Sequence, residues 1–189
     1  MIHKLAIKLV DRLMKYGAAK KSRAVYIYGM ECFISECIAN ILLFAIALPL
    51  HQGRMMLFWL ISFLAIRVHI GGYHASTHWM CLIISTLVGI GSLPLNELWS
   101  LLGIYSLLIL LLCDAYILFT KAVTHPKHPV SPEKARHERR RLLISAAVEN
   151  VILLACFALH WDWYAPILSG MFCAVAMSVA GRRSFMSSD

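Results

Sequence analysis

The chain has 189 residues, 60% of them hydrophobic, and a mean hydropathy of +0.70. Soluble domains are about 45–50% apolar, so this excess, arranged in long blocks, excludes an ordinary soluble domain and indicates an integral membrane protein. The formal net charge is +8, but the basic residues flank the apolar blocks, which favours a role in membrane topology and lipid contact over nucleic-acid binding.

Residues 1–24 predict an amphipathic helix at the cytoplasmic face of the membrane. Two stripes recur at helical spacing, one apolar (Ile2, Leu5, Leu9, Leu13, Tyr16) and one basic (Lys4, Lys8, Arg12, Lys15). This pattern is typical of a helix that lies among lipid headgroups. An anchor that sets topology is the simpler interpretation, and a peptide-docking surface is the alternative. We expect no cleavable signal peptide, because the stretch lacks an apolar core.

Residues 25–189 predict a single all-α transmembrane domain. About six spans are expected, at residues 25–50, 55–66, 79–95, 98–120, 142–159 and 164–180. A full span needs roughly 20 residues, so the second one is short. A four-span arrangement with interfacial pieces is therefore the alternative.

The distribution of positive charge supports six spans in a multi-pass protein of the cell membrane. With a cytoplasmic N-terminus, every one of the 18 Lys and Arg residues except Arg54 falls inside, as the positive-inside rule predicts. Both termini, residues 67–81 and the basic loop 121–141 are then cytoplasmic.

Six polar side chains interrupt the apolar runs: Glu31, Glu36, Asn40, Asp114, Glu149 and Asn150. Such groups are costly in lipid and usually face the interior of the bundle. Hydrogen bonding between helices is the simplest role. Glu36 and Asn40 share a helix face, and either Glu31 or Asp114 is a candidate to orient a catalytic imidazole.

Residues 67–81, RVHIGGYHASTHWMC, hold the most chemistry. Gly71 and Gly72 predict a helix break, after which Ser76 or Thr77 can cap a new helix. Cys81 then occupies about the fourth helical position, where free N–H groups and the helix dipole favour a thiolate. The other five cysteines lie in apolar runs, so we expect them to be inert.

The base that activates Cys81 has several candidates. From spacing alone, His74 and His78 are equally good, and His69 is less favoured. His74, His78 and Cys81 also form a set of ligands that zinc accepts, but no local Glu supplies the base of such sites, so we expect no metal and no cofactor.

The basic loop contains three prolines between His125 and Pro132, which prevent a helix there. It leads to Arg139, Arg140 and Arg141 at the start of the fifth span. These arginines are either an ordinary positive-inside run or a site for an acidic peptide or anionic lipid.

The chain resembles the accessory gene regulator B (AgrB) family of membrane cysteine endopeptidases over most of its length. The resemblance rests on an R-x-x-G-G-x-H-x6-C core, on an acidic residue with a nearby Asn in the first span, and on a His-Pro pair in the basic loop. The matching residues are Arg67, Gly71, Gly72, His74, Cys81, Glu36, Asn40, His125 and Pro126.

This resemblance implies a His74–Cys81 dyad with Arg67 and Gly72 in support. It also implies an AgrD-like quorum-sensing propeptide as substrate, which loses its C-terminal tail and is cyclised to a thiolactone or lactone through an acyl-thioester on Cys81. Homodimerisation stays open. The rival from another class is a scaffold or transporter that uses Glu31, Glu36, Asp114 and Glu149 as a polar pathway.

Overall fold

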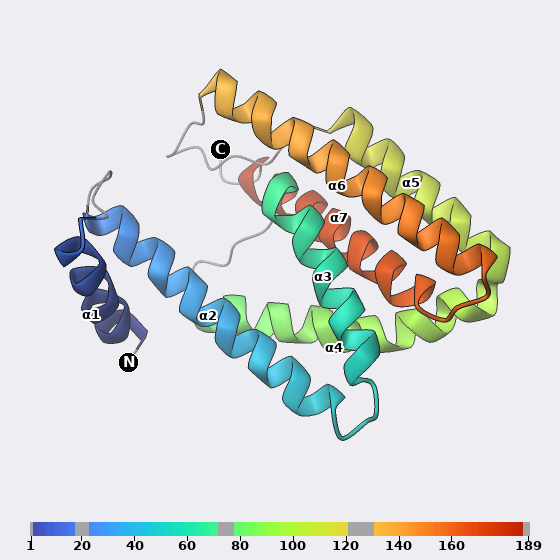
Figure 1. Ribbon diagram of the computed structural model, residues 1–189, viewed down its shortest axis with the longest axis horizontal. Helices are drawn as coiled ribbons and strands as arrows, with labels where there is room; N and C mark the ends of the chain where they lie inside the picture. The colour runs from blue at the N-terminus through green and yellow to red at the C-terminus, as the bar shows by residue number, and fades with distance from the viewer. Residues whose placement is uncertain (1, 18–22, 72–77, 121–130, 187–189) are drawn as a thin grey trace. The chain divides into compact units, whose positions relative to one another are not determined.

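The computed structural model describes residues 2–17, 23–71, 78–120 and 131–186 (Figure 1). Regular structure in these ranges is entirely helical, which confirms the all-α class. The elements in chain order are α1 (Ile2–Lys15), α2 (Arg23–Ala47), α3 (Gly53–Ile70), α4 (His78–Leu102), the 3₁₀ turn η1 (Gly103–Tyr105), α5 (Ser106–Phe119), α6 (Pro132–Ala158) and α7 (Tyr164–Met186).

Five helical segments of the described chain are long and apolar enough to cross a membrane: Arg23–Ala47, Gly53–Ile70, Met80–Phe119, Pro132–Ala158 and Tyr164–Arg183. The third contains 40 residues, or roughly 60 Å of helix at 1.5 Å per residue, which is enough for two crossings. It combines the predicted third and fourth spans, so the count of six stays a prediction.

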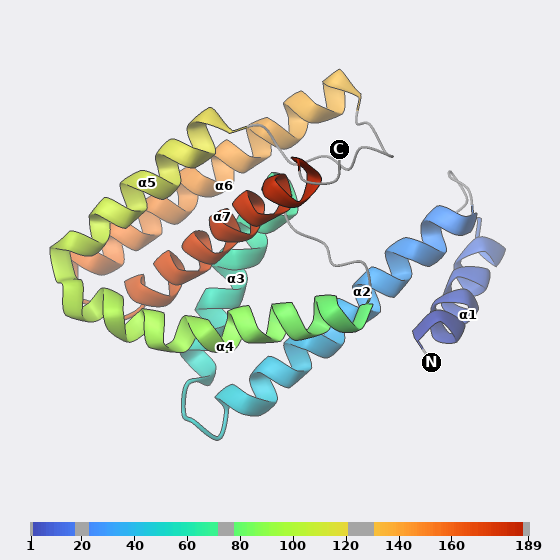
Figure 2. The same ribbon diagram turned by 180° about the vertical axis from the view of Figure 1, so that it is seen from behind.

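Several boundaries differ from the sequence-based expectation. The largest shift is at the fifth span, which is α6 and begins at Pro132 instead of Leu142, because Ser131 caps the helix there. The second span is α3, with 18 residues instead of about 12, because the helix begins at Gly53 and continues through Arg67 to Ile70. The division between the third and fourth spans falls at Gly103 and not near Leu95, since Pro94 is accommodated inside α4. Gly103 has φ +52°, a left-handed conformation that suits glycine, and the chain changes direction there (Figures 1 and 2).

The helices form two compact units, residues 1–46 with 75–87, and residues 47–74 with 88–189. In the first unit, polar contacts join α1 to α2. The Arg23 guanidinium pairs with the Asp11 carboxylate, with N···O distances of 2.8–3.1 Å, and His3 Nδ1 hydrogen-bonds the Glu31 carboxylate. α1 buries Ala6 and Val10, so the amphipathic N-terminal stretch is helical and one of its faces is covered.

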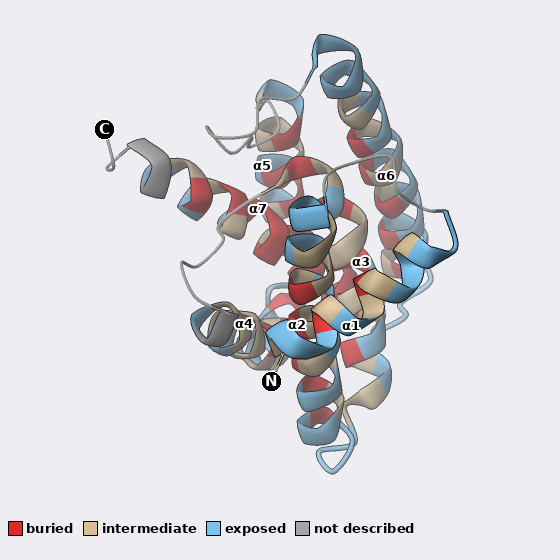
Figure 3. Cartoon of the chain, turned by 90° about the vertical axis from the view of Figure 1, so that its left-hand side faces the viewer, coloured by how far each residue is buried: buried red, intermediate tan, exposed pale blue. Residues whose placement is uncertain are grey.

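α7 is the central helix of the second unit, since it packs against α3, α5 and α6, and buried residues, drawn in red, recur along it in Figure 3. Of its span, 67% is buried, against 22–33% for the other four candidate spans. Small side chains let α3 approach it closely, as at membrane helix crossings generally. A Cβ at Gly170 would lie 2.7 Å from the carbonyl oxygen of Trp59 and 2.8 Å from Ser62.

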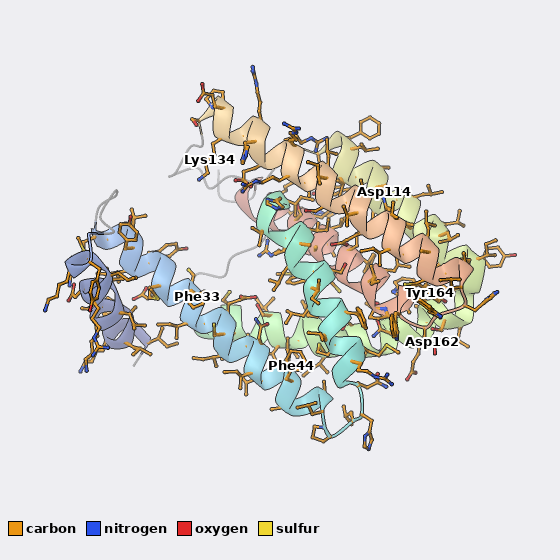
Figure 4. All side chains as sticks on the ribbon, viewed as in Figure 1. Phe33, Phe44, Asp114, Lys134, Asp162 and Tyr164 are labelled. Carbon is orange, nitrogen blue, oxygen red and sulfur yellow. The ribbon has the colours of Figure 1, made fainter. Side chains whose placement is uncertain are left out.

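The two ends of the second unit differ in chemistry, with Lys134 at one end and Tyr164 at the other (Figure 4). One end carries polar contacts of His69 with Glu138, of Arg139 with the end of α5, and of Arg182 with Tyr116. The other carries aromatic pairs: Phe58 with Trp163, Trp161 with Trp163, and Phe157 with Tyr164. Aromatic side chains gather where a membrane meets water, so this polarity fits a unit that spans a bilayer.

Apolar side chains also cover the outside of the second unit. Leu101 and Phe119 are 85% and 89% exposed, and Leu111, Leu112 and Val151 are each more than half exposed. A soluble protein rarely leaves so much apolar surface in water. Lipid is the solvent that fits this surface.

Candidate functional site

The segment that precedes the predicted nucleophile leaves α3 through a glycine. Arg67 and His69 lie in the last turn of α3, and Gly71 follows the last helical residue with φ +73°. The Gly71 N–H donates to the carbonyl of Arg67 at 3.2 Å. The predicted helix break is therefore confirmed at Gly71.

The predicted base lies outside the described residues. Residues 72–77 contain Gly72 and His74, and also Ser76 and Thr77, the two candidate helix caps. His78 begins α4, but its side chain is likewise outside the described part. The roles of His74 and His78 remain predictions from the spacing and from the resemblance.

Cys81 is the fourth residue of α4 and is half-buried, which agrees with the expected position at a helix start. N–H groups in the first turn of a helix have no intrahelical acceptor. They are therefore available to an anion formed beside Cys81. The structure thus places Cys81 at a helix start, and its role as a nucleophile stays a prediction.

A polar face of α2 borders this thiol within the first unit. Tyr28 and Cys32 are both within electrostatic range of Cys81, and the Tyr28 hydroxyl hydrogen-bonds the Cys32 thiol. Glu36 is in turn within range of Cys32. Tyr28, Cys32, Glu36 and Asn40 recur every four residues, so they lie on one helix face.

Sequence reasoning paired Glu36 with Asn40 but missed the first half of this face. The signal was present, since Tyr28 and Cys32 extend the same spacing of four residues toward the N-terminus. It was obscured because an isolated cysteine in an apolar run usually behaves as a small buried hydrophobe. Cys32 is in fact only half-buried, whereas Cys113, Cys156 and Cys173 are buried and Cys37 is exposed.

The carboxyls of the rival polar pathway make separate local contacts. Asn150 Nδ2 donates to both oxygens of Asp114 at 2.9 and 3.0 Å, between α6 and α5 (Figure 4). The Ser62 hydroxyl lies 2.8 Å from Glu149 Oε2 and 2.8 Å from the carbonyl oxygen of Ile167. These contacts join helices, as the simplest interpretation of the intramembrane polar residues predicts.

The start of α6 carries the basic run. Ser131 caps this helix and Pro132 occupies its first turn, so the predicted proline-rich interruption ends there. Arg140 and Arg141 are exposed. Arg139 is half-buried and donates to carbonyls at the end of α5, those of Ile117 (2.6 Å), Thr120 (2.5 Å) and Leu118.

No group of three His, Cys, Asp or Glu side chains is arranged to hold a metal ion in the described ranges. The zinc set predicted as the alternative includes His74 and His78, whose side chains lie outside those ranges. The choice between a zinc site and thiol catalysis is therefore left to an inhibitor test, which compares a chelator with a thiol-alkylating reagent.

The fold and the surroundings of Cys81 define a multi-pass helical membrane protein with one thiol at a polar helix start. The family model of accessory gene regulator B (AgrB) matches residues 3–180, and the chain belongs to this family. Neither the curated proteins nor the solved structures contain a match to it. Membership implies a role in processing the quorum-sensing peptide of the accessory gene regulator system.

Proposed function

We propose that the chain is a membrane cysteine endopeptidase that cleaves the C-terminal tail from an AgrD-like propeptide and promotes ring closure of the remainder. The observation that carries this proposal is the position of Cys81. It is half-buried at the fourth position of α4, seven residues after His74 in a chain whose family processes such peptides. A thiol and an imidazole at this spacing supply a nucleophile and a base.

The first half of the reaction transfers the peptide to the enzyme. His74 takes the proton of the Cys81 thiol, and the sulfur attacks the carbonyl that joins the signal segment to the tail. His74 then protonates the leaving amine, and the tail departs with a new N-terminus. The signal segment remains on Cys81 as an acyl-thioester.

The second half releases the ring. A Cys or Ser side chain within the peptide attacks the thioester carbonyl, its proton passes through His74 to the Cys81 sulfur, and a thiolactone or lactone forms. Water must be kept away, since hydrolysis would give a linear product. The half-buried position of Cys81 supports such exclusion. Backbone N–H groups of the first turn of α4, or Arg67, are candidates to stabilise the oxyanion.

Contacts with the substrate extend beyond the dyad in this proposal. Arg140 and Arg141 are exposed and can attract the acidic tail of the propeptide. Arg139 was predicted to join them, but its guanidinium already binds three carbonyls of α5, so we assign its charge to that helix end. Glu36 and Asn40 are proposed to support the site from α2.

The test is the reaction of the purified protein with a synthetic AgrD-like propeptide, followed by mass spectrometry. Replacement of the other five cysteines by Ala should leave cleavage intact, and adding Cys81→Ser to that background should abolish it. Cleavage that survives Cys81→Ser would disprove the nucleophile. Thiol alkylation should inhibit the enzyme, whereas inhibition by a chelator alone would favour the zinc alternative. Absence of any cleavage by the wild type would favour the scaffold or transporter.

The choice of base has its own test. Loss of a general base lowers the rate by about 10²–10⁴, so His74→Ala should show such a loss at normal membrane abundance. His78→Ala, three residues from Cys81, is the matched control and should lose much less. The opposite ranking would transfer the role of base to His78.

A further inference from the structure

Two consecutive residues of α6, Glu138 and Arg139, hold the ends of two other helices. Glu138 Oε2 accepts a hydrogen bond from Nδ1 of His69, in the last turn of α3, at 2.8 Å. Arg139 donates to the last carbonyls of α5. Because both contacts start from one turn of α6, that turn fixes the end of α3 and the end of α5 together (Figure 1).

The contact between His69 and Glu138 is sheltered. Their side chains are only 16% and 27% exposed, so solvent screens this pair less than an ion pair on the open surface. Arg141 and His137 also lie within electrostatic range of Glu138, both on α6 itself. Of these groups, His69 comes from another helix, so its contact with Glu138 is the one that joins α3 to α6.

The end of α3 is also where the catalytic segment begins. His74 follows Ile70 by four residues, a distance that the chain spans with at most roughly 14 Å of backbone. Ile70 is fully buried and Gly71 ends the helix, so the starting point of the segment depends on how firmly this last turn is held. A shift of about 1 Å at a reacting group can cost about a hundredfold in rate.

We propose that Glu138 is a positioning residue for the reaction, acting through His69 to fix the end of α3 from which the segment that carries His74 departs. This inference rests on the proposed function, since it presupposes that His74 and Cys81 react with the peptide. It gives Glu138 and His69 a role that neither spacing nor the resemblance assigned to them. Their effect should fall on turnover and not on substrate binding.

The experiment measures kcat and KM of propeptide cleavage for single and double variants of the full chain. Glu138→Ala and His69→Ala should each lower kcat about tenfold or more with little change in KM. The double variant should be no slower than the slower single variant, because the two residues act through one contact. Glu138→Gln keeps an acceptor and His69→Asn keeps a donor near Nδ1, so both should stay close to wild type.

Glu133→Ala is the matched control, since Glu133 is an exposed carboxylate in the first turn of the same helix, and it should leave kcat unchanged. Wild-type kcat in both alanine variants, or fully additive losses in the double variant, would overturn the inference. If Glu138→Ala does not accumulate as a folded protein, the comparison of His69→Ala with His69→Asn tests the inference instead. A lowered kcat in His69→Ala with a kcat near wild type in His69→Asn supports it, and equal kcat values overturn it.

Cys81→Ala in the same assay separates this inference from the proposed function. If Cys81→Ala still cleaves the peptide, the proposed function itself fails. If Cys81→Ala is inactive while Glu138→Ala and His69→Ala turn over normally, only the positioning role fails.

Discussion

The close approach of α3 and α7 at Gly170 should make this position intolerant of any side chain. A Cβ there would lie 2.7 Å from the carbonyl oxygen of Trp59 and 2.8 Å from both Cβ and Oγ of Ser62. The first of these atoms belongs to the backbone of α3 and cannot rotate away. Gly170→Ala therefore forces the two helices apart.

The size of the effect follows from the displacement. Moving the contact from 2.7 Å to the 3.4 Å at which ordinary contacts begin requires a separation of about 0.7 Å. Overpacking of a well-packed interior costs about 1–3 kcal/mol, and the separation also disturbs the Ser62 hydroxyl beside Glu149. For a chain of this length, each kcal/mol lowers Tm by about 2–4 °C, so the expected decrease is about 2–12 °C.

The assay is thermal unfolding of the purified protein in detergent, monitored by tryptophan fluorescence. Gly91→Ala is the matched control: Gly91 lies within α4, and a Cβ there meets nothing within 4 Å. That variant should be neutral, or more stable by up to about 1 kcal/mol, because Ala favours a helix over Gly. Equal Tm values for the two variants would refute the packing of α3 against α7 described above.

Three further predictions concern charge and topology. Glu149→Gln should keep a Tm near that of the wild type, whereas Glu149→Ala should lower it. The single hydroxyl proton of Ser62 cannot be donated both to the Ile167 carbonyl and to an ionised carboxylate, whereas a neutral group at position 149 can donate to the Ser62 oxygen. Equally low Tm values for the two variants would contradict this. The double variant Arg140→Gln with Arg141→Gln should raise KM, change kcat less, and reduce the salt dependence of KM, whereas Arg54→Gln should do none of these. An unchanged KM at low salt would show that these arginines serve only topology or lipid binding. Both termini and the basic loop should be cytoplasmic, so an impermeant thiol reagent applied to intact cells should label none of the single-cysteine variants at Ser22, Ser131 and Ser187, and labelling of any one would disprove the topology.

Much of the architecture follows from local chemistry. Long apolar runs require helices in lipid, since only a helix or a closed barrel satisfies its own backbone there. Glycine and proline then punctuate the runs, so the end of α3 at Gly71 was predictable. The prolines also indicated where the loop before α6 ends, although the fifth span was expected to begin only at residue 142. Ser76 or Thr77 as a helix cap predicted Cys81 at about the fourth helical position, and α4 begins at His78 accordingly.

Boundaries inside apolar runs were less predictable. Residues 80–119 form one continuous candidate span, and the polar residues Asn96 and Glu97 lie near Leu95 and not near Gly103. Pro94 is the stronger local signal, yet α4 accommodates it. Gly103, with its left-handed conformation, follows the last residue of α4.

The sequence by itself determined that this chain is a helical membrane protein with one thiol in a polar helix start, because composition, spacing and the positions of glycine and proline act locally. Only the tertiary structure showed that Glu138 hydrogen-bonds His69, that Arg139 donates to carbonyls at the end of α5, and that Gly170 lets the backbone of α3 pack closely. The partners in these contacts are between 19 and 111 residues apart in the chain, and no periodic pattern pairs them. They become neighbours only when the helices pack, so packing assigns these residues their partners.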